Sequence, residues 1–126
     1  MYTIVALMGE AGSGKDTILH DIVSLDPNLH EIISCTSRPM REGEQEGKNY
    51  YYISEEEFCD KILTNEMIEV TRFNGWFYGT PYSSLKEDCI NIGVFNPFGI
   101  RSLAEEDDVE LITFYISTSP KERLLR

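Results

Sequence analysis

The sequence predicts an α/β fold, with helices packed on a parallel sheet and a small mixed-β insert. Three observations support this prediction. An apolar, β-rich run at residues 2–8 ends in a glycine-rich loop, an amphipathic helix pattern follows that loop, and a β-rich stretch at about 34–80 lies between strand–loop–helix units. We therefore assign residues 1–33 and 81–126 to the core and residues 34–80 to the insert.

Each element follows from local pattern. Apolar side chains at helical spacing after the loop predict the first helix, Ser54 and Glu57 have the spacing of a capping box, and Asn74-Gly75 is typical of a hairpin turn. The runs at 2–8, 89–95 and 109–116 are expected to be buried strands. The expected strands are 2–8, 29–34, 50–53, 67–73, 76–78, 89–95 and 109–116, and the expected helices are 18–25, 54–64 and 99–106.

The composition and net charge indicate which kinds of binding partner and cellular location to expect. The 126 residues suit one domain, and a formal net charge of −11 argues against a nucleic-acid or anionic-membrane partner. Cys35, Cys59 and Cys89 are widely spaced with no CxxC, so neither a disulfide framework nor a zinc site is expected. We expect a reducing, cytoplasmic location, since the chain shows no signal peptide and no apolar run of membrane-spanning length.

The loop after the first strand predicts phosphate binding. Gly9, Gly14 and Lys15 in GEAGSGKDT have the Walker A spacing. Backbone without side chains can curl around phosphate oxygens with its N–H groups inward, and the next helix adds the positive end of its dipole. Lys15 is expected to reach the β- and γ-phosphates. This predicts a three-layer core of the P-loop NTPase type. The predicted ATP-binding residues are Gly9, Glu10, Ala11, Gly12, Ser13, Gly14, Lys15, Asp16 and Thr17.

Asp16 stands where the Walker A pattern usually has a Ser or Thr that binds Mg²⁺. Thr17 follows, but the next residue at a helix start points elsewhere. A carboxylate is a good ligand for a hard cation, so Asp16 is a candidate for holding the Mg²⁺ that accompanies ATP, directly or through water. The alternative is a negative charge that only complements the helix dipole.

Two stretches of the insert, SCTSRPMREGEQEGKNYYYI at 34–53 and IEVTRFNGWFYGT at 68–80, resemble the guanylate kinase family together with the loop. The resemblance runs from Tyr2 to about Leu85 and continues more weakly to the end. It implies ATP-dependent phosphorylation of GMP or dGMP, with the insert as the NMP-binding subdomain. The matching insert positions are Ser34, Thr36, Arg38, Pro39, Arg41, Gly43, Glu44, Gly47, Tyr50, Glu69, Tyr78, Gly79 and Thr80.

The resemblance also implies roles. Lys15 and Arg38 would be the catalytic cations. The GMP phosphate would be held by Arg38, Arg41, Tyr50 and Tyr78, guanine would be read by Ser34, Glu69 and Thr80, and Asn96 would contact the acceptor.

The residue types suit those roles. Arg38 and Arg41 are forked cations three residues apart in an acidic chain, and such forks bind phosphate through two hydrogen bonds. Glu69 lies between Ile68 and Val70, so its side chain is expected to face away from theirs. A carboxylate is the natural acceptor for the adjacent N1–H and 2-amino donors of guanine.

The sequence departs from the family in two places. The family's Asp-x-Asp at the end of the strand matching 89–95 is replaced by Val94 and Asn96, of which Asn96 can hydrogen-bond but adds no charge for Mg²⁺. The sequence also ends at STSPKERLLR, where the family begins its arginine-bearing lid. We expect a chain without the lid, whether truncated or naturally short, in which closure and water exclusion are incomplete.

Two alternatives stay open. One is an enzyme resembling ribose 1,5-bisphosphate kinases, whose phosphate loop is similar, although such an acceptor has no guanine for Glu69 to read. The other is a non-catalytic guanylate-kinase-like binding module. Such modules generally lose the loop lysine and glycines, so Gly14 and Lys15 favour the enzyme.

Overall fold

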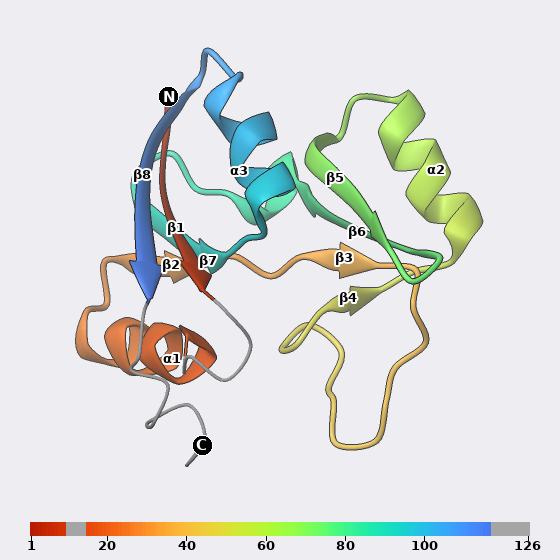
Figure 1. Ribbon diagram of the computed structural model, residues 1–126, viewed down its shortest axis with the longest axis horizontal. Helices are drawn as coiled ribbons and strands as arrows, with labels where there is room; N and C mark the ends of the chain where they lie inside the picture. Colours follow the sequence, from red (N-terminus) through yellow and green to blue (C-terminus); the bar gives the residue numbers. More distant parts are fainter. Residues whose placement is uncertain (10–14, 117–126) are drawn as a thin grey trace.

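The chain forms two four-stranded sheets that lie in separate halves of the molecule (Figure 1). The computed structural model describes residues 1–9 and 15–116, and for residues 15 and 16 the backbone alone. In these ranges, no helix combines the length and the apolar character needed to cross a membrane.

The first sheet is parallel and has the strand order β2-β7-β1-β8. Its strands are β1 (Tyr2–Gly9), β2 (Leu29–Glu31), β7 (Ile90–Val94) and β8 (Val109–Ile116). The parallel sheet of an α/β core is thus confirmed. β2 is shorter than the predicted 29–34, because the chain leaves this sheet after Ile32, whose N–H donates to Ile92 O at 2.9 Å, and enters the second sheet at Cys35.

Helices cover both faces of this sheet. Helix α1 (Lys15–Leu25) packs Leu19 against Leu7 and Ile92, while α3 (Pro97–Ala104) packs Leu103 into a cluster with Ile4. Consecutive strand residues point to opposite faces, so β1 serves both clusters. The result is the three-layer arrangement that the sequence predicts. α1 begins three residues before the predicted 18, and α3 runs two residues ahead of the predicted 99–106.

The second sheet is mixed and has the order β4-β3-β6-β5. It contains β3 (Cys35–Thr36), β4 (Tyr51–Tyr52), β5 (Met67–Phe73) and β6 (Trp76–Pro81), with β3 and β4 parallel and the other pairs antiparallel. The predicted hairpin turn is present at Asn74 and Gly75, whose φ angles are 52° and 81°. β6 is longer than expected, and a short 3₁₀ turn, η1 (Tyr82–Ser84), follows it.

Helix α2 (Glu55–Leu63) lies against the second sheet. Ser54 is its N-cap, and its Oγ accepts a hydrogen bond from the Glu57 N–H at 3.0 Å, as the capping-box spacing predicts. Phe58 of this helix is fully buried and stacks on Phe77, with ring centroids 5.2 Å apart. The helix therefore holds β6 in place behind the predicted binding residues.

Strand β8 forms as predicted, but the prediction that it is buried is wrong. Ile112, Phe114 and Tyr115 are 42%, 54% and 55% exposed. Among the strands that the structure describes, β8 pairs with β1 alone, at the edge of the sheet. An apolar run fits a central or an edge strand equally well, so the sequence could not separate the two.

The two sheets share one hydrophobic core. Helix α3 contacts both β8 of the first sheet and β5 of the second. Accordingly, Ile68 from β5 lies in the same buried cluster as Ile4, Phe95 and Leu103. This contact fixes the place where the insert meets the core.

Candidate functional site

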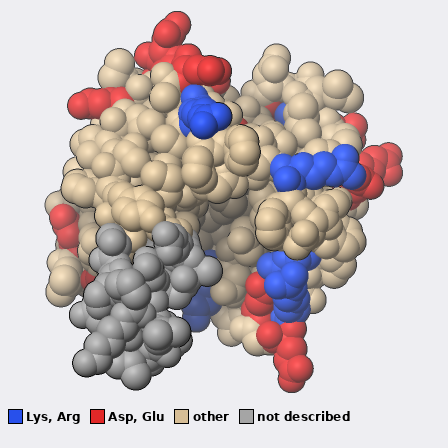
Figure 2. All heavy atoms as spheres, in the orientation of Figure 1, with Lys and Arg blue, Asp and Glu red and all other residues tan. Residues whose placement is uncertain are grey.

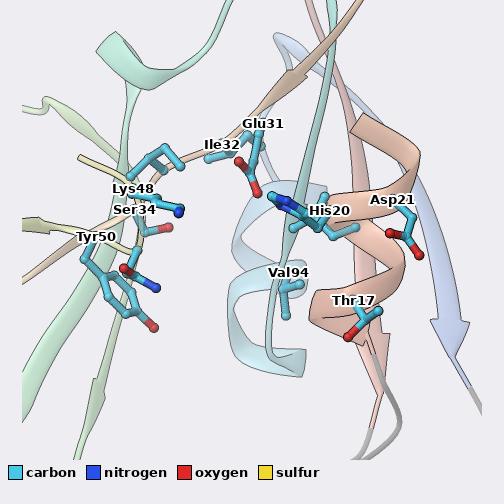
Figure 3. Close-up of a pocket in the computed structure, with 12 residues that line it drawn as sticks. Thr17, His20, Asp21, Glu31, Ile32, Ser34, Lys48, Tyr50 and Val94 are labelled. Atoms are coloured by element: carbon cyan, nitrogen blue, oxygen red, sulfur yellow. The ribbon is translucent and has the colours of Figure 1, made fainter. Parts of the chain in front are cut away.

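A cavity of about 590 Å³ separates the first sheet and α1 from the insert (Figure 3). Thr17 and His20 of α1 and Val94 at the end of β7 line one side, and Ser34 and Tyr50 line the other. Ligands of open parallel sheets bind outside the carboxyl ends of the strands, which is where this cavity lies. Three predicted site residues, Thr17, Ser34 and Tyr50, thus border one space.

The three residues predicted to read guanine lie together, and one of them, Ser34, lines this cavity. Thr80 Oγ1 donates to Glu69 Oε1 at 3.0 Å, and Ser34 Oγ lies 3.4 Å from the same Thr80 oxygen. Thr80 is fully buried, while Ser34 reaches the cavity. Because β5 and β6 pair Glu69 with Thr80 in register, the hairpin sets this chain of polar groups.

Glu69 is a buried carboxyl group with an unused acceptor. The residue is only 9% exposed, and its Oε2 has no hydrogen-bond partner in the described part of the chain. Burial raises the pKa of Glu69 to about 7, while the hydrogen bond from Thr80 acts in the opposite direction and lowers the pKa by less. A register shift of the β-bulge kind lies between Met67 and Glu69, and both Ile68 and Glu69 are buried. That Glu69 faces away from Ile68 and Val70 stays a prediction.

Arg38 is held by an ion pair inside the protein. Its Nη1 and Nη2 donate to Glu44 Oε1 and Oε2 at 2.8 and 2.9 Å, and Nη1 also donates to Pro39 O at 3.0 Å. Arg38 is 5% exposed, so it is no solvated surface charge. The bond to Glu44, with a smaller contribution from Tyr78, raises the pKa of Arg38, and the same pair lowers the pKa of Glu44 to about 2.

Aromatic rings surround this guanidinium. Its Cζ lies 5.4 Å from the Tyr50 ring centroid and 5.9 Å from that of Tyr52, within cation–π range. Tyr50 and Tyr78 are also in edge contact, with centroids 5.7 Å apart. The structure therefore brings three of the four predicted phosphate-binding residues together, Arg38, Tyr50 and Tyr78.

Two other predicted residues lie apart from this group. Arg41 is exposed, and its backbone N–H donates to Glu44 Oε1 at 2.8 Å. Asn96 is the N-cap of α3: its Oδ1 accepts from the Gly99 N–H at 2.8 Å, and its Nδ2 lies 3.5 Å from Thr71 Oγ1. The amide thus serves the fold at the carboxyl end of β7.

The predicted ATP site is only partly described. Gly9 ends β1 and α1 begins at Lys15, so a strand and a helix flank the segment predicted to bind phosphate. Thr17 is exposed on the first turn of α1. The predicted residues Glu10, Ala11, Gly12, Ser13 and Gly14, and the side chains of Lys15 and Asp16, lie outside the described part of the structure.

The described part of the chain contains no cluster of side chains that could bind a metal ion. No three His, Cys, Asp or Glu side chains in residues 1–9 and 17–116 group closely enough to hold one. At the carboxyl end of β7, Val94 and Asn96 offer no carboxylate, and Asn96 Oδ1 already caps α3. The predicted Mg²⁺ ligand, Asp16, stays a prediction.

Sequence reasoning missed several residues. Glu44 belongs to the family motif, but the sequence predicts no role for it, because its pairing with Arg38 depends on a turn that spacing alone does not show. His20, Asp21, Glu31, Lys48 and Asn49 also line the cavity. For the polar face of α1, helical periodicity indicates a shared face, but no local signal shows that it borders a cavity.

On the face that Figure 2 shows, positive charge is dispersed. On the face in Figure 2, the Lys and Arg side chains form separate small groups among tan and red atoms rather than a continuous basic area. Near the cavity, Lys48 is a lining residue, and the buried Arg38 lies against Tyr50, which also lines it.

Known proteins resemble this chain in sequence and in fold. A family model described as guanylate kinase matches residues 1–91. A guanylate kinase of Prochlorococcus marinus (strain MIT 9312) is 44% identical over 84 residues, which are 67% of this chain and 46% of that protein. A guanylate kinase of Synechococcus elongatus (strain ATCC 33912 / PCC 7942 / FACHB-805) is 43% identical over 90 residues, 71% of this chain and 49% of that protein.

A solved structure gives the same result for the fold. The crystal structure of guanylate kinase from Anaplasma phagocytophilum superimposes with a TM-score of 0.74 at 26% identity, and covers 90% of this chain and 59% of that one. The chain spans about half the length of the curated relatives it matches.

Proposed function

The chain belongs to the guanylate kinase family, and on that premise we propose that it binds GMP or dGMP beside the cavity and phosphorylates it with ATP. The names of its relatives support a kinase of this kind. The nucleotide, the donor and the transfer itself are our proposals for this chain.

The observation that carries the proposal is the buried Glu69 carboxyl. Oε2 is buried and has no partner among the described residues, whereas native proteins pair nearly all such groups. Guanine presents two adjacent N–H donors, and an ionised carboxylate accepts both through its two oxygens. Adenine presents no such pair of donors, so Glu69 supports a guanine nucleotide.

Arg38 supports the phosphate end of the same ligand. Tyr50 borders the cavity, and its ring lies against the Arg38 guanidinium, which places a buried fork donor next to the space. Arg41 adds an exposed cation three residues away. A nucleoside monophosphate with its base at Glu69 and its phosphate at Arg38 would use both groups.

ATP is assigned to the loop before α1, with Lys15 as the cation that follows the transferred phosphoryl group. Mg²⁺ bound to ATP would neutralise phosphate charge. Because the described side chains form no metal site, Asp16 is proposed as its contact on the strength of its position alone, and no step is derived through the ion.

Calorimetric titration tests the acceptor. At pH 8, GMP and dGMP should bind, whereas AMP and ribose 1,5-bisphosphate should bind at least tenfold more weakly. Glu69→Gln keeps the shape but offers one acceptor in place of two, so GMP affinity should fall by about tenfold to a hundredfold, the usual cost of losing a hydrogen bond to a charged group. Glu110→Gln, an exposed acid on β8, is the matched control. Equal affinity for all four ligands would refute the proposal.

A second candidate is a module that binds the nucleotide without turning it over. It is favoured by one observation: Asn96 is engaged as a helix cap, and Val94 beside it carries no polar group. A coupled assay for ADP release with GMP present separates the two candidates, because the module would show GMP binding and no GMP-dependent ADP release.

A further inference from the structure

We propose that Glu44 is a positioning residue, which fixes Arg38 so that the edge of its guanidinium that carries the unpartnered Nε meets the phosphate of the acceptor. This inference rests on the proposed function. Glu44 binds the same guanidinium that is proposed to bind the phosphate, and the two do not compete because each uses different donors.

Glu44 occupies one edge of the guanidinium completely. Its two oxygens accept from Nη1 and Nη2 at 2.8 and 2.9 Å, the parallel geometry that a carboxylate and a guanidinium prefer. The remaining Nη1 hydrogen goes to Pro39 O. Three of the five guanidinium donors are therefore bound within the turn itself.

On the other edge, the Nε donor is unused, while the Tyr78 side chain interacts with the guanidinium and raises the pKa of Arg38. Nε is buried and has no hydrogen-bond partner among the described residues. In a guanidinium, the Nε hydrogen and the second Nη2 hydrogen point in the same direction and form a second fork. A buried donor without a partner is rare in native proteins, and two oxygens of a phosphate would satisfy this fork.

Packing keeps that edge in one direction. The rings of Tyr50 and Tyr52 lie 5.4 and 5.9 Å from Arg38 Cζ, and Arg38 is 5% exposed. Rotation of the guanidinium would break the Glu44 pair inside the protein, where an unpaired charge is strongly unfavourable. Since Tyr50 also borders the cavity, the fixed fork lies near the space where a ligand would enter.

Glu44 can hold Arg38 in this orientation throughout the neutral pH range. Arg38 lowers the pKa of Glu44 to about 2, so its carboxylate stays ionised. Glu44 Oε1 also accepts from the Arg41 N–H at 2.8 Å. One carboxylate thus sets the turn that carries both predicted phosphate-binding arginines.

Binding of GMP and of guanosine, which has no phosphate, tests the role. Glu44→Gln should weaken GMP binding by about tenfold or more, because the amide cannot accept from both nitrogens and Arg38 loses its orientation. Guanosine binding should change less than twofold. Glu44→Asp should recover part of the GMP affinity, and Glu42→Gln, an exposed acid in the same loop, should leave it unchanged.

Two further measurements separate positioning from a general effect on the fold. In an Arg38→Ala background, Glu44→Gln should change GMP affinity less than twofold. In the unmodified protein, inorganic phosphate should shift the Arg38 Nε–H resonance, and it should not in Glu44→Gln.

Each contrary result has a distinct meaning. Failure of the unmodified protein to bind GMP would overturn the proposed function. GMP binding by Glu44→Gln within twofold of the unmodified protein would overturn this inference alone. So would equal losses of GMP and guanosine, or no phosphate-dependent shift at Nε, because these would make Glu44 a purely structural residue.

Discussion

At the scale of single residues, two glutamates of this chain are driven in opposite directions. Burial without a cation raises the pKa of Glu69 to about 7, while the Arg38 guanidinium lowers that of Glu44 to about 2. Glu69 can therefore gain or lose its proton near neutral pH, whereas Glu44 stays ionised there.

The state of Glu69 should make guanosine binding depend on pH. The folded protein holds the proton of Glu69 more tightly than the unfolded chain, and only the ionised carboxylate accepts both guanine donors. Affinity should therefore rise by up to about tenfold per pH unit from pH 5.5 towards 7 and level off above it. Calorimetry with guanosine avoids titration of the GMP phosphate. Glu69→Gln should give a flat profile, and a flat profile in the unmodified protein would contradict the assignment.

The same proton affects stability with a defined sign. Because the pKa of Glu69 is raised in the fold, the benefit of its protonated form is complete below about 4.5 and is lost as the pH rises through 7. Binding of a ligand that donates to the carboxylate would oppose this loss.

Residue types in the insert were predictable because the family motif names them. Their pairing was not. Glu44 stands six positions after Arg38, and nothing in the spacing shows that a turn brings the two into a bidentate ion pair. The register shift between Met67 and Glu69 is likewise not visible in the alternation of residue types along the strand.

At the scale of elements, the N-cap of α3 is a residue that the family resemblance assigns to the acceptor. Asn96 Oδ1 caps this helix through the Gly99 N–H. Asn96→Ala should lower the free energy of unfolding by about 1 kcal/mol, measured by urea denaturation, because the cap is lost. Asn96→Asp should be at least as stable as the unmodified protein, since it keeps the cap and adds a charge that suits the helix dipole. Equal stability of the Ala variant would show that the cap contributes nothing.

Elements with local signals were predicted well, and those set by distant contacts were not. The Ser54 cap and the Asn74-Gly75 turn are decided by neighbouring residues and formed as expected. β3 has two residues and exists because Thr36 and Cys35 pair with Tyr78 and Gly79. The exposure of β8 depends on its place at the sheet edge, which no pattern within 109–116 encodes.

At the scale of the whole molecule, the shared cluster around α3 should make the two sheets unfold together. Leu103 is fully buried in this cluster with Ile4 from one sheet and Ile68 from the other. Fluorescence of Trp76, the sole tryptophan, reports on the second sheet, and far-ultraviolet circular dichroism reports on the whole chain. Their urea transitions should coincide.

A substitution in this cluster sharpens the expectation. Leu103→Ala should lower the free energy of unfolding by about 2 to 5 kcal/mol and move both transitions equally. Phe98→Ala, on the same helix but at a position that is 67% exposed, should move them far less. Separate midpoints for the two signals would show that the insert and the core unfold independently.

The Arg38–Glu44 pair also has an evolutionary consequence. Loss of Glu44 would leave the buried Arg38 charge unpaired, and loss of Arg38 would remove the donor that Glu44 orients, so selection would act on the two positions as a unit. Lysine cannot stand in for the arginine, because an ammonium has a single donor centre and cannot hold a carboxylate on one edge while offering another edge to a ligand. Drift in this turn is therefore expected mainly at its exposed residues, such as Met40 and Glu42.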